Sequence, residues 1–228
     1  MDFLIESLRA ALVLVVAADS EVMHAVWTSL FTSGCAIVLA GLIGIPAGTA
    51  LGLGRFVGRR AAVTGLNTLM ALPTVVVGLV LYGLLSRQGP LGAWGLLFTP
   101  AAMIVGQTVL AAPIVANYTL AAVAGADPRI MTTAQTLGAS RLLAIRQLLL
   151  ETRFGIIAAV VAGFGRVIAE VGVAMMLGGN IRGYTRTMTT AIALETSKGE
   201  FAFGLALGIV LMTVALVVNL FLNLLQQR

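Results

Sequence analysis

The chain has 228 residues, of which 59% are hydrophobic and 10% charged, and its formal net charge is +5. Because a soluble domain has about 25% charged residues, this composition excludes an ordinary soluble fold and indicates an all-α membrane protein in contact with lipid. The positive charge does not indicate a nucleic-acid partner, because the basic residues are scattered in loops between long apolar runs.

Five apolar runs are long enough to cross a bilayer, which takes an α-helix of about 20 residues. These runs cover residues 22–53, 61–85, 96–123, 154–177 and 201–225. The N-terminal region 1–21 has only a short unbroken apolar run, which favours a helix over 3–18 in the membrane interface; a sixth span is the alternative. We therefore expect one transmembrane domain over 1–228.

Small and polar residues interrupt the first three spans. Glycine recurs every four residues at Gly44, Gly48 and Gly52, which puts small residues on one helix face and predicts close packing of another helix backbone. Asn67 lies within the second span and Asn117 within the third.

The loops differ in charge. Loops 54–60 and 125–153 together with the C-terminus hold eight basic residues and two acids, whereas the opposite set holds five basic residues and six acids. Basic residues concentrate in cytoplasmic loops, so we place loop 125–153 in the cytoplasm. With five spans, the N-terminus is then outside and the C-terminus is cytoplasmic.

Motifs for catalysis are absent from the sequence. It has no G-x-x-x-x-G-K-[ST] phosphate loop and no H-E-x-x-H, and it has one histidine and one cysteine, His24 and Cys35. We therefore expect no enzyme, no catalytic residue and no metal or cofactor bound by this chain. A membrane-embedded hydrolase is a third class of protein to consider, but the sequence offers no plausible set of catalytic residues for it.

Two polar features lie in or beside the fourth span. Arg166 and Glu170 are four residues apart within it, so they share a helix face and either form a packing ion pair or border a pathway or gate. The outer segment 178–200 is rich in hydroxyl, amide and glycine residues and has a short predicted helix over 187–196. Asn180, Arg186 and Thr189 in this segment are donors suited to an oxyanion; a solvated loop is the alternative.

The segment 127–151 predicts a cytoplasmic helical hairpin. Asp127 before Pro128 is typical of a helix start, Gly138 predicts a break, and a second amphipathic helix follows. The apolar side of this second helix is predicted to comprise Leu142, Leu143, Ile145, Leu148 and Leu149.

This hairpin resembles the cytoplasmic loop of binding-protein-dependent ABC importer permeases. That loop has an acid-Ala-Ala triplet, a glycine and a later apolar-x-Leu-Pro, which correspond here to Thr132-Thr133-Ala134, Gly138, and Leu148 with Leu150. The sequence departs from the pattern at Thr132 and at Glu151. Further motifs resemble the molybdate/sulfate/tungstate branch: Gly165-Arg166, Glu170-Val171-Gly172, Gly179-Asn180-Ile181 and Thr185-Arg186-Thr187. The segments 72–78, 151–156 and 178–201 are most similar to tungstate permeases.

The resemblance implies a type I ABC importer permease in a prokaryotic plasma (inner) membrane. A homodimer of this chain would work with a cytoplasmic ABC ATPase dimer, which binds ATP-Mg, and with an extracytoplasmic oxyanion-binding protein. Five residues are expected to contact the ATPase. Gly138 is carried over from the family motif, and Arg129, Thr132, Ser140 and Arg141 are inferred from their polarity and position. Two alternatives are a molybdate or sulfate permease and, in another class, an autonomous secondary transporter.

Overall fold

The computed structural model describes the backbone of residues 2–226 and the side chains of residues 5–218 and 220. Within that range the chain is helical, without strands, as predicted. The elements are α1 (Asp2–Val16), α2 (Ser20–Leu53), α3 (Arg59–Met70), α4 (Thr74–Leu85), the 3-10 turn η1 (Gly92–Trp94), α5 (Pro100–Ala124), α6 (Arg129–Thr136), α7 (Arg141–Glu151), α8 (Arg153–Ile168), α9 (Gly172–Gly178), α10 (Met188–Lys198) and α11 (Phe201–Gln226).

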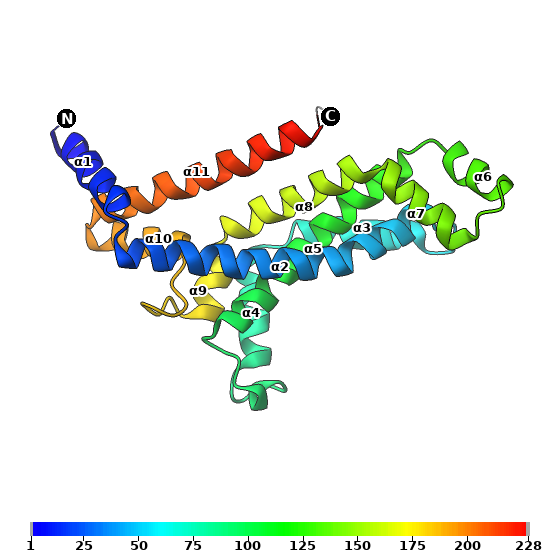
Figure 1. Cartoon of the computed structure of the whole chain (residues 1–228). Helices are drawn as coiled ribbons and strands as arrows, with labels where there is room; N and C mark the ends of the chain where they lie inside the picture. Colours follow the sequence, from blue (N-terminus) through cyan, green and yellow to red (C-terminus); the bar gives the residue numbers. More distant parts are fainter. Residues whose placement is uncertain (1, 227–228) are drawn as a thin grey trace.

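The centre of the molecule is the packing of α2 against α5, with α8 beside both (Figure 1). A Cβ atom on Gly44 would lie 2.9 Å from the carbonyl oxygen of Ala112, and one on Gly48 would meet the carbonyl oxygen of Ala116. Side chains at these positions would therefore push the two backbones apart. The close approach predicted from the four-residue glycine spacing is confirmed.

The second span is not one straight helix, and the prediction of an uninterrupted run over 61–85 is wrong in this respect. It consists of α3 and α4, which meet at an angle of 95°. Pro73 lies at the break and is the N-cap of α4. Proline has no N–H to donate and disfavours helical backbone in the residue before it, which explains why α3 ends at Met70.

The predicted span over 154–177 is also interrupted. The structure ends α8 at Ile168 and starts α9 at Gly172. Between them, the Glu170 carboxylate accepts a hydrogen bond from the Val173 N–H at 3.2 Å, so the side chain caps α9 instead of continuing the helix.

The expected number of spans agrees with the structure when the bent helices are counted in pairs. By length and composition α2, α5 and α11 can each cross a membrane, and the number rises to as many as five if the bent pairs α3 with α4 and α7 with α8 each count as one span. The second pair covers 141–168 instead of the predicted 154–177, and its first helix, α7, belongs to the segment that the sequence predicts as a cytoplasmic hairpin. α1 is helical as predicted and packs against α11, and Asp19 caps the start of α2 by accepting the N–H of Glu21 at 2.9 Å. Its position in the membrane interface stays a prediction.

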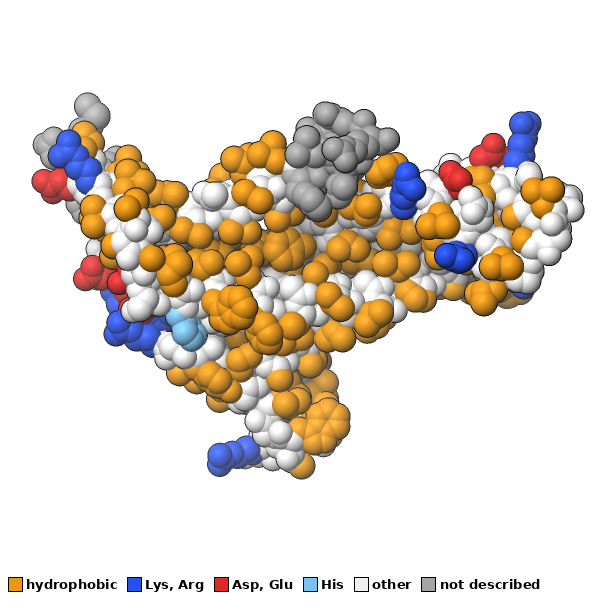
Figure 2. All heavy atoms as spheres, viewed as in Figure 1, with side chains coloured by type: hydrophobic (Ala, Val, Ile, Leu, Met, Phe, Trp, Pro, Cys, Tyr) orange, Lys and Arg blue, Asp and Glu red, His pale blue; other side chains and the backbone are white. Residues whose placement is uncertain are grey.

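The surface of the long helices is apolar. On the face drawn in Figure 2, hydrophobic side chains cover these helices, and charged side chains gather at the two ends and at one tip. Large side chains such as Trp27, Leu42 and Met212 are exposed. Exposed apolar area of this extent is unfavourable in water, so these faces contact lipid or another chain.

Candidate functional site

The residues singled out in the sequence fall into two groups at opposite ends of the molecule. One group is the α6–α7 hairpin, and the other surrounds the start of α10 (Figure 1). We call the second group the α10 cluster and define it as Arg166, Glu170, Asn180, Arg186 and Thr189.

The hairpin has the predicted helix–glycine–helix form. The Asp127 carboxylate accepts the N–H of Arg129 at 2.8 Å, at the start of α6. Gly138 has φ of +90°, a left-handed conformation that glycine adopts without steric cost. Ser140 caps α7 by accepting the Leu143 N–H at 3.4 Å. Local sequence therefore specifies the hairpin.

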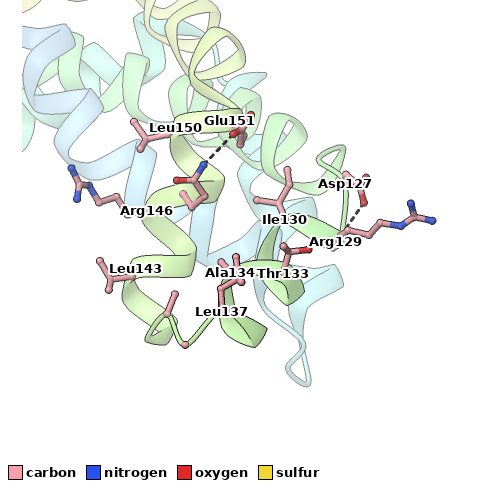
Figure 3. A pocket seen from close by; sticks show the side chains of 13 residues that line it. Asp127, Arg129, Ile130, Thr133, Ala134, Leu137, Leu143, Arg146, Leu150 and Glu151 are labelled. Atoms are coloured by element: carbon pink, nitrogen blue, oxygen red, sulfur yellow. Dashed lines mark hydrogen bonds between the residues drawn. The ribbon is translucent and has the colours of Figure 1, made fainter.

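A groove of about 840 Å³ runs between α6 and α7 (Figure 3). Its apolar lining comes from both helices and the turn between them: Ile130, Ala134, Leu137, Leu143 and Leu150. The side chains of Arg129 and Arg146 point away from the groove on opposite sides. The hairpin thus presents an apolar depression with cations at its edges.

All five predicted coupling residues are exposed, but they do not form one patch. Arg129 and Gly138 line the groove, whereas Thr132, Ser140 and Arg141 lie outside its lining.

The residues of the predicted apolar side of α7 differ in exposure. Leu148 is buried together with Ala144, whereas Leu142 and Leu143 are exposed. The sequence signal for the buried face was the four-residue spacing of Ala144 and Leu148. The apolar surface of the hairpin, which includes Leu137 at 83% exposure, was missed because a leucine beside a turn glycine has no periodic pattern.

In the α10 cluster, the predicted ion pair is present. Arg166 Nη1 lies 2.8 Å from Glu170 Oε2, and the Glu170 side chain is only 3% exposed. The backbone carbonyl of Glu170 accepts a hydrogen bond from the Thr189 hydroxyl at 2.8 Å. Glu170 therefore ties the α8–α9 break to the first turn of α10.

Asn180 and the threonines at the start of α10 extend the same cluster. Asn180 has φ of +50° and donates its amide N–H to the carbonyl oxygen of Thr190 at 3.3 Å. Its own Oδ1 is buried without a hydrogen-bond partner in the described structure. Thr187 and Thr190 form a reciprocal capping box, which explains why the predicted helix over 187–196 begins where it does.

Arg186 is buried and paired with acids from two other parts of the chain. Its Nη1 lies 2.7 Å from Glu21 Oε1 and 3.4 Å from Glu195 Oε1. Glu21 also binds Arg182 at 2.5 Å, and Glu195 binds Lys198 at 3.0 Å. Much of the guanidinium charge is therefore already compensated, although Arg186 Nε is buried without a partner in the described structure.

Glu21 and Glu195 are the members of this network that the sequence analysis missed. The three-residue spacing of Glu195 and Lys198 was a usable local signal. No local signal connects Glu21 with Arg186, because they belong to opposite ends of the chain. Together the network lines a cavity of about 430 Å³ beside Glu200 and Phe203.

Comparison with known proteins places this architecture in context. The model of the family described as binding-protein-dependent transport system inner membrane component matches residues 40–228. The tungstate uptake system permease protein TupB of Campylobacter jejuni is 42% identical over 219 residues, which are 96% of this chain and 92% of that protein. TupB of Peptoclostridium acidaminophilum is 37% identical over 228 residues, the full length of both chains. More distant relatives are named as sulfate and molybdenum transport permeases.

A solved structure has the same arrangement of helices. A chain of the inward-facing MetNI methionine ABC transporter matches with a TM-score of 0.74 at 18% identity, covering 90% of this chain and 94% of that one. At this identity the likeness concerns the fold alone, and it confirms the predicted type I importer permease fold.

Proposed function

Because this chain belongs to the family of binding-protein-dependent transport system inner membrane components, we propose that it is the subunit through which an ATP-driven importer carries tungstate across the membrane. Family membership makes the chain a permease component of an ABC importer and not a catalytic domain. The observation that carries the choice of tungstate is the 42% and 37% identity to two tungstate permeases over nearly their whole lengths.

The α6–α7 hairpin is the proposed contact for the ATPase. Its exposed leucines surround an apolar groove, and burying such side chains in a second protein is favourable. Arg129 and Arg141 supply positive charge beside the apolar surface. The ATPase would bind ATP with Mg²⁺, and the hairpin would transmit its closure to the helices.

The α10 cluster is the proposed switch element at the outer end. Glu170 occupies the break between α8 and α9 and is bonded to both Arg166 and Thr189. A break of this kind can change angle while the helices on either side stay rigid. Two copies of the chain would enclose the path, and a loaded binding protein would dock near the α9–α10 segment.

The orientation follows from charge. The excess of basic residues in its loops supports a cytoplasmic hairpin, and the α10 cluster, at the opposite end of the long helices, would then face outward. The N-terminus would be outside and the C-terminus cytoplasmic. Each partner protein then biases the inward- or outward-facing state by binding it more tightly.

Uptake by the reconstituted complex tests the proposal. The permease, its ATPase and its binding protein are placed in proteoliposomes, and accumulated tungsten, molybdenum and sulfur are measured with and without ATP. We expect ATP-dependent uptake of tungstate in preference to molybdate and sulfate. Preference for another oxyanion would show that the substrate is wrong, and uptake driven by an ion gradient without ATP would favour a secondary transporter.

A further inference from the structure

A polar face of α3 lies exposed on the protomer at membrane depth. Thr64, Asn67 and Thr68 are exposed and share one face, since they are three and four residues apart. The half-buried side of the same helix, which includes Leu66 and Met70, lies toward the rest of the chain, and α3 packs against α5. The three polar residues thus belong to the exposed part of α3, and Asn67 lies where this part meets α5.

Hydrogen bonds orient the amide of Asn67 on this face. The side-chain Nδ2 of Asn117, on α5, donates to Asn67 Oδ1 and also lies 2.9 Å from Met70 Sδ. Both of these neighbours are acceptors, so the nitrogen of the Asn117 amide is the atom that faces them. Because Asn67 uses its oxygen in this bond, its Nδ2 group is left as a free donor in the described structure.

The position of Asn67 along α3 puts this donor inside the bilayer. At 1.5 Å per residue, Asn67 lies about 12 Å along α3 from Arg59, at the basic loop, and Asn117 about 10 Å along α5 from its end at Ala124. Polar side chains at such depth are unfavourable against lipid tails and normally face a bundle interior or a water-filled cavity. The exposed polar face of α3 thus requires an aqueous or protein neighbour.

We propose that Asn67, oriented by Asn117, is a substrate-contacting residue that donates hydrogen bonds to the tetrahedral oxyanion in the inner part of its path. This inference rests on the proposed oxyanion transport. The chemistry fits a site of passage: neutral N–H donors bind a dianion, but more weakly than an arginine would, and an ion must be able to leave each site along its route. Thr64 adds a hydroxyl on the same face.

Cysteine accessibility distinguishes an aqueous path from the other surroundings. In a Cys35→Ser background, Asn67→Cys is compared with Thr213→Cys, which lies among the exposed apolar side chains of α11. The assembled complex is treated from the cytoplasmic side with a charged, water-soluble thiol reagent, with and without tungstate. We expect modification of Asn67→Cys, slower modification when tungstate is present, and none for Thr213→Cys.

Transport by point variants tests the donor itself. Asn67→Asp keeps the size of the side chain but replaces the donor with a negative charge, and it should lower tungstate uptake about tenfold or more. Asn67→Gln keeps an amide donor and should retain most uptake. ATPase activity stimulated by the loaded binding protein, together with the yield of complex, shows that each variant has assembled.

Several results would overturn the inference. If Asn67→Cys is as unreactive toward the thiol reagent as Thr213→Cys, residue 67 faces lipid. If it instead forms a disulfide between two copies of the chain and is not modified by the reagent, residue 67 is a contact between subunits. Normal uptake by an assembled Asn67→Asp complex would exclude the donor role. A wrong choice of tungstate gives a different result, because the wild-type complex would then take up another oxyanion. The role of Asn67 would in that case be tested by measuring uptake of that oxyanion by the same variants.

Discussion

Arg186 Nη1 and Glu21 Oε1 lie 2.7 Å apart although 165 positions separate them in the sequence. This ion pair connects the start of α2 to the segment before α10. Since Glu195 also contacts Arg186, a buried arginine is held between two carboxylates from different elements. The arrangement joins the start of α2 to α10 and leaves little of the Arg186 charge free for a passing anion.

Glu21→Gln should therefore destabilise the contact between the start of α2 and α10. The change leaves the buried Arg186 with one compensating carboxylate, Glu195, and a buried charge that loses part of its compensation destabilises the fold. We expect a lower melting temperature of the purified protein. Glu200→Gln is the matched control, because Glu200 lines the same cavity without an ion pair in the described structure. Equal shifts for the two variants would contradict a specific role for Glu21.

Arg166→Ala should impair transport or assembly. Glu170 is almost fully buried, and Arg166 is its only ion-pair partner among the described residues, so the change leaves a carboxylate uncompensated. Arg166→Lys restores the charge and should recover part of the activity. The measurement is ATP-driven uptake normalised to complex yield. If uptake and yield both equal the wild type in Arg166→Ala, the pair is incidental.

Gly138→Val should abolish uptake and the coupling of ATP hydrolysis while the chain remains inserted. A Cβ at this position would meet no atom within 4 Å, so the effect comes from the backbone: φ of +90° is strained for a β-branched residue. Asparagine tolerates left-handed backbone, so Gly138→Asn should be milder. ATPase activity stimulated by the loaded binding protein is the measurement, and normal stimulation of Gly138→Val would refute the docking assignment.

Leu137→Glu should weaken association with the ATPase without lowering the stability of the chain. Leu137 is 83% exposed, so the substitution removes no internal packing, but a carboxylate would be unfavourable in an apolar interface. Val57→Glu, in the neighbouring turn between α2 and α3, is the matched control because Val57 is fully exposed and lies outside the hairpin. Co-purification with the ATPase is compared; equal retention in both variants would place the contact elsewhere.

The sequence predicted much of the local structure because the relevant signals are short. Apolar run length indicated the five spans, and the four-residue spacing of Gly44 and Gly48 indicated the close contact that α2 makes with α5. Asp127 and Gly138 indicated the start of the hairpin and its turn. Pro73 lies within the predicted second span, but no bend was predicted there; the structure has a 95° angle between α3 and α4, and α4 packs against α9.

The candidate site was predictable residue by residue but not as an arrangement. Polarity within an apolar run selected Glu170, the donor-rich segment 178–200 supplied Asn180 and Thr189, and the structure brings all three together at the start of α10. The sequence pattern did not predict that Glu170 would interrupt its span by capping α9. That outcome depends on competition between a side-chain hydrogen bond and continuation of the helix, which composition does not reveal.

What the sequence by itself determined is the membrane class, the approximate spans, the helical hairpin and the family, because hydropathy and short motifs are local properties of the chain. Only the tertiary structure decided which polar groups are compensated and which are free. Arg186 is paired with Glu21, whereas Asn67 uses its oxygen on Asn117 and keeps a donor at the surface. These relationships join distant segments, and packing of the helices alone brings their side chains within hydrogen-bonding distance.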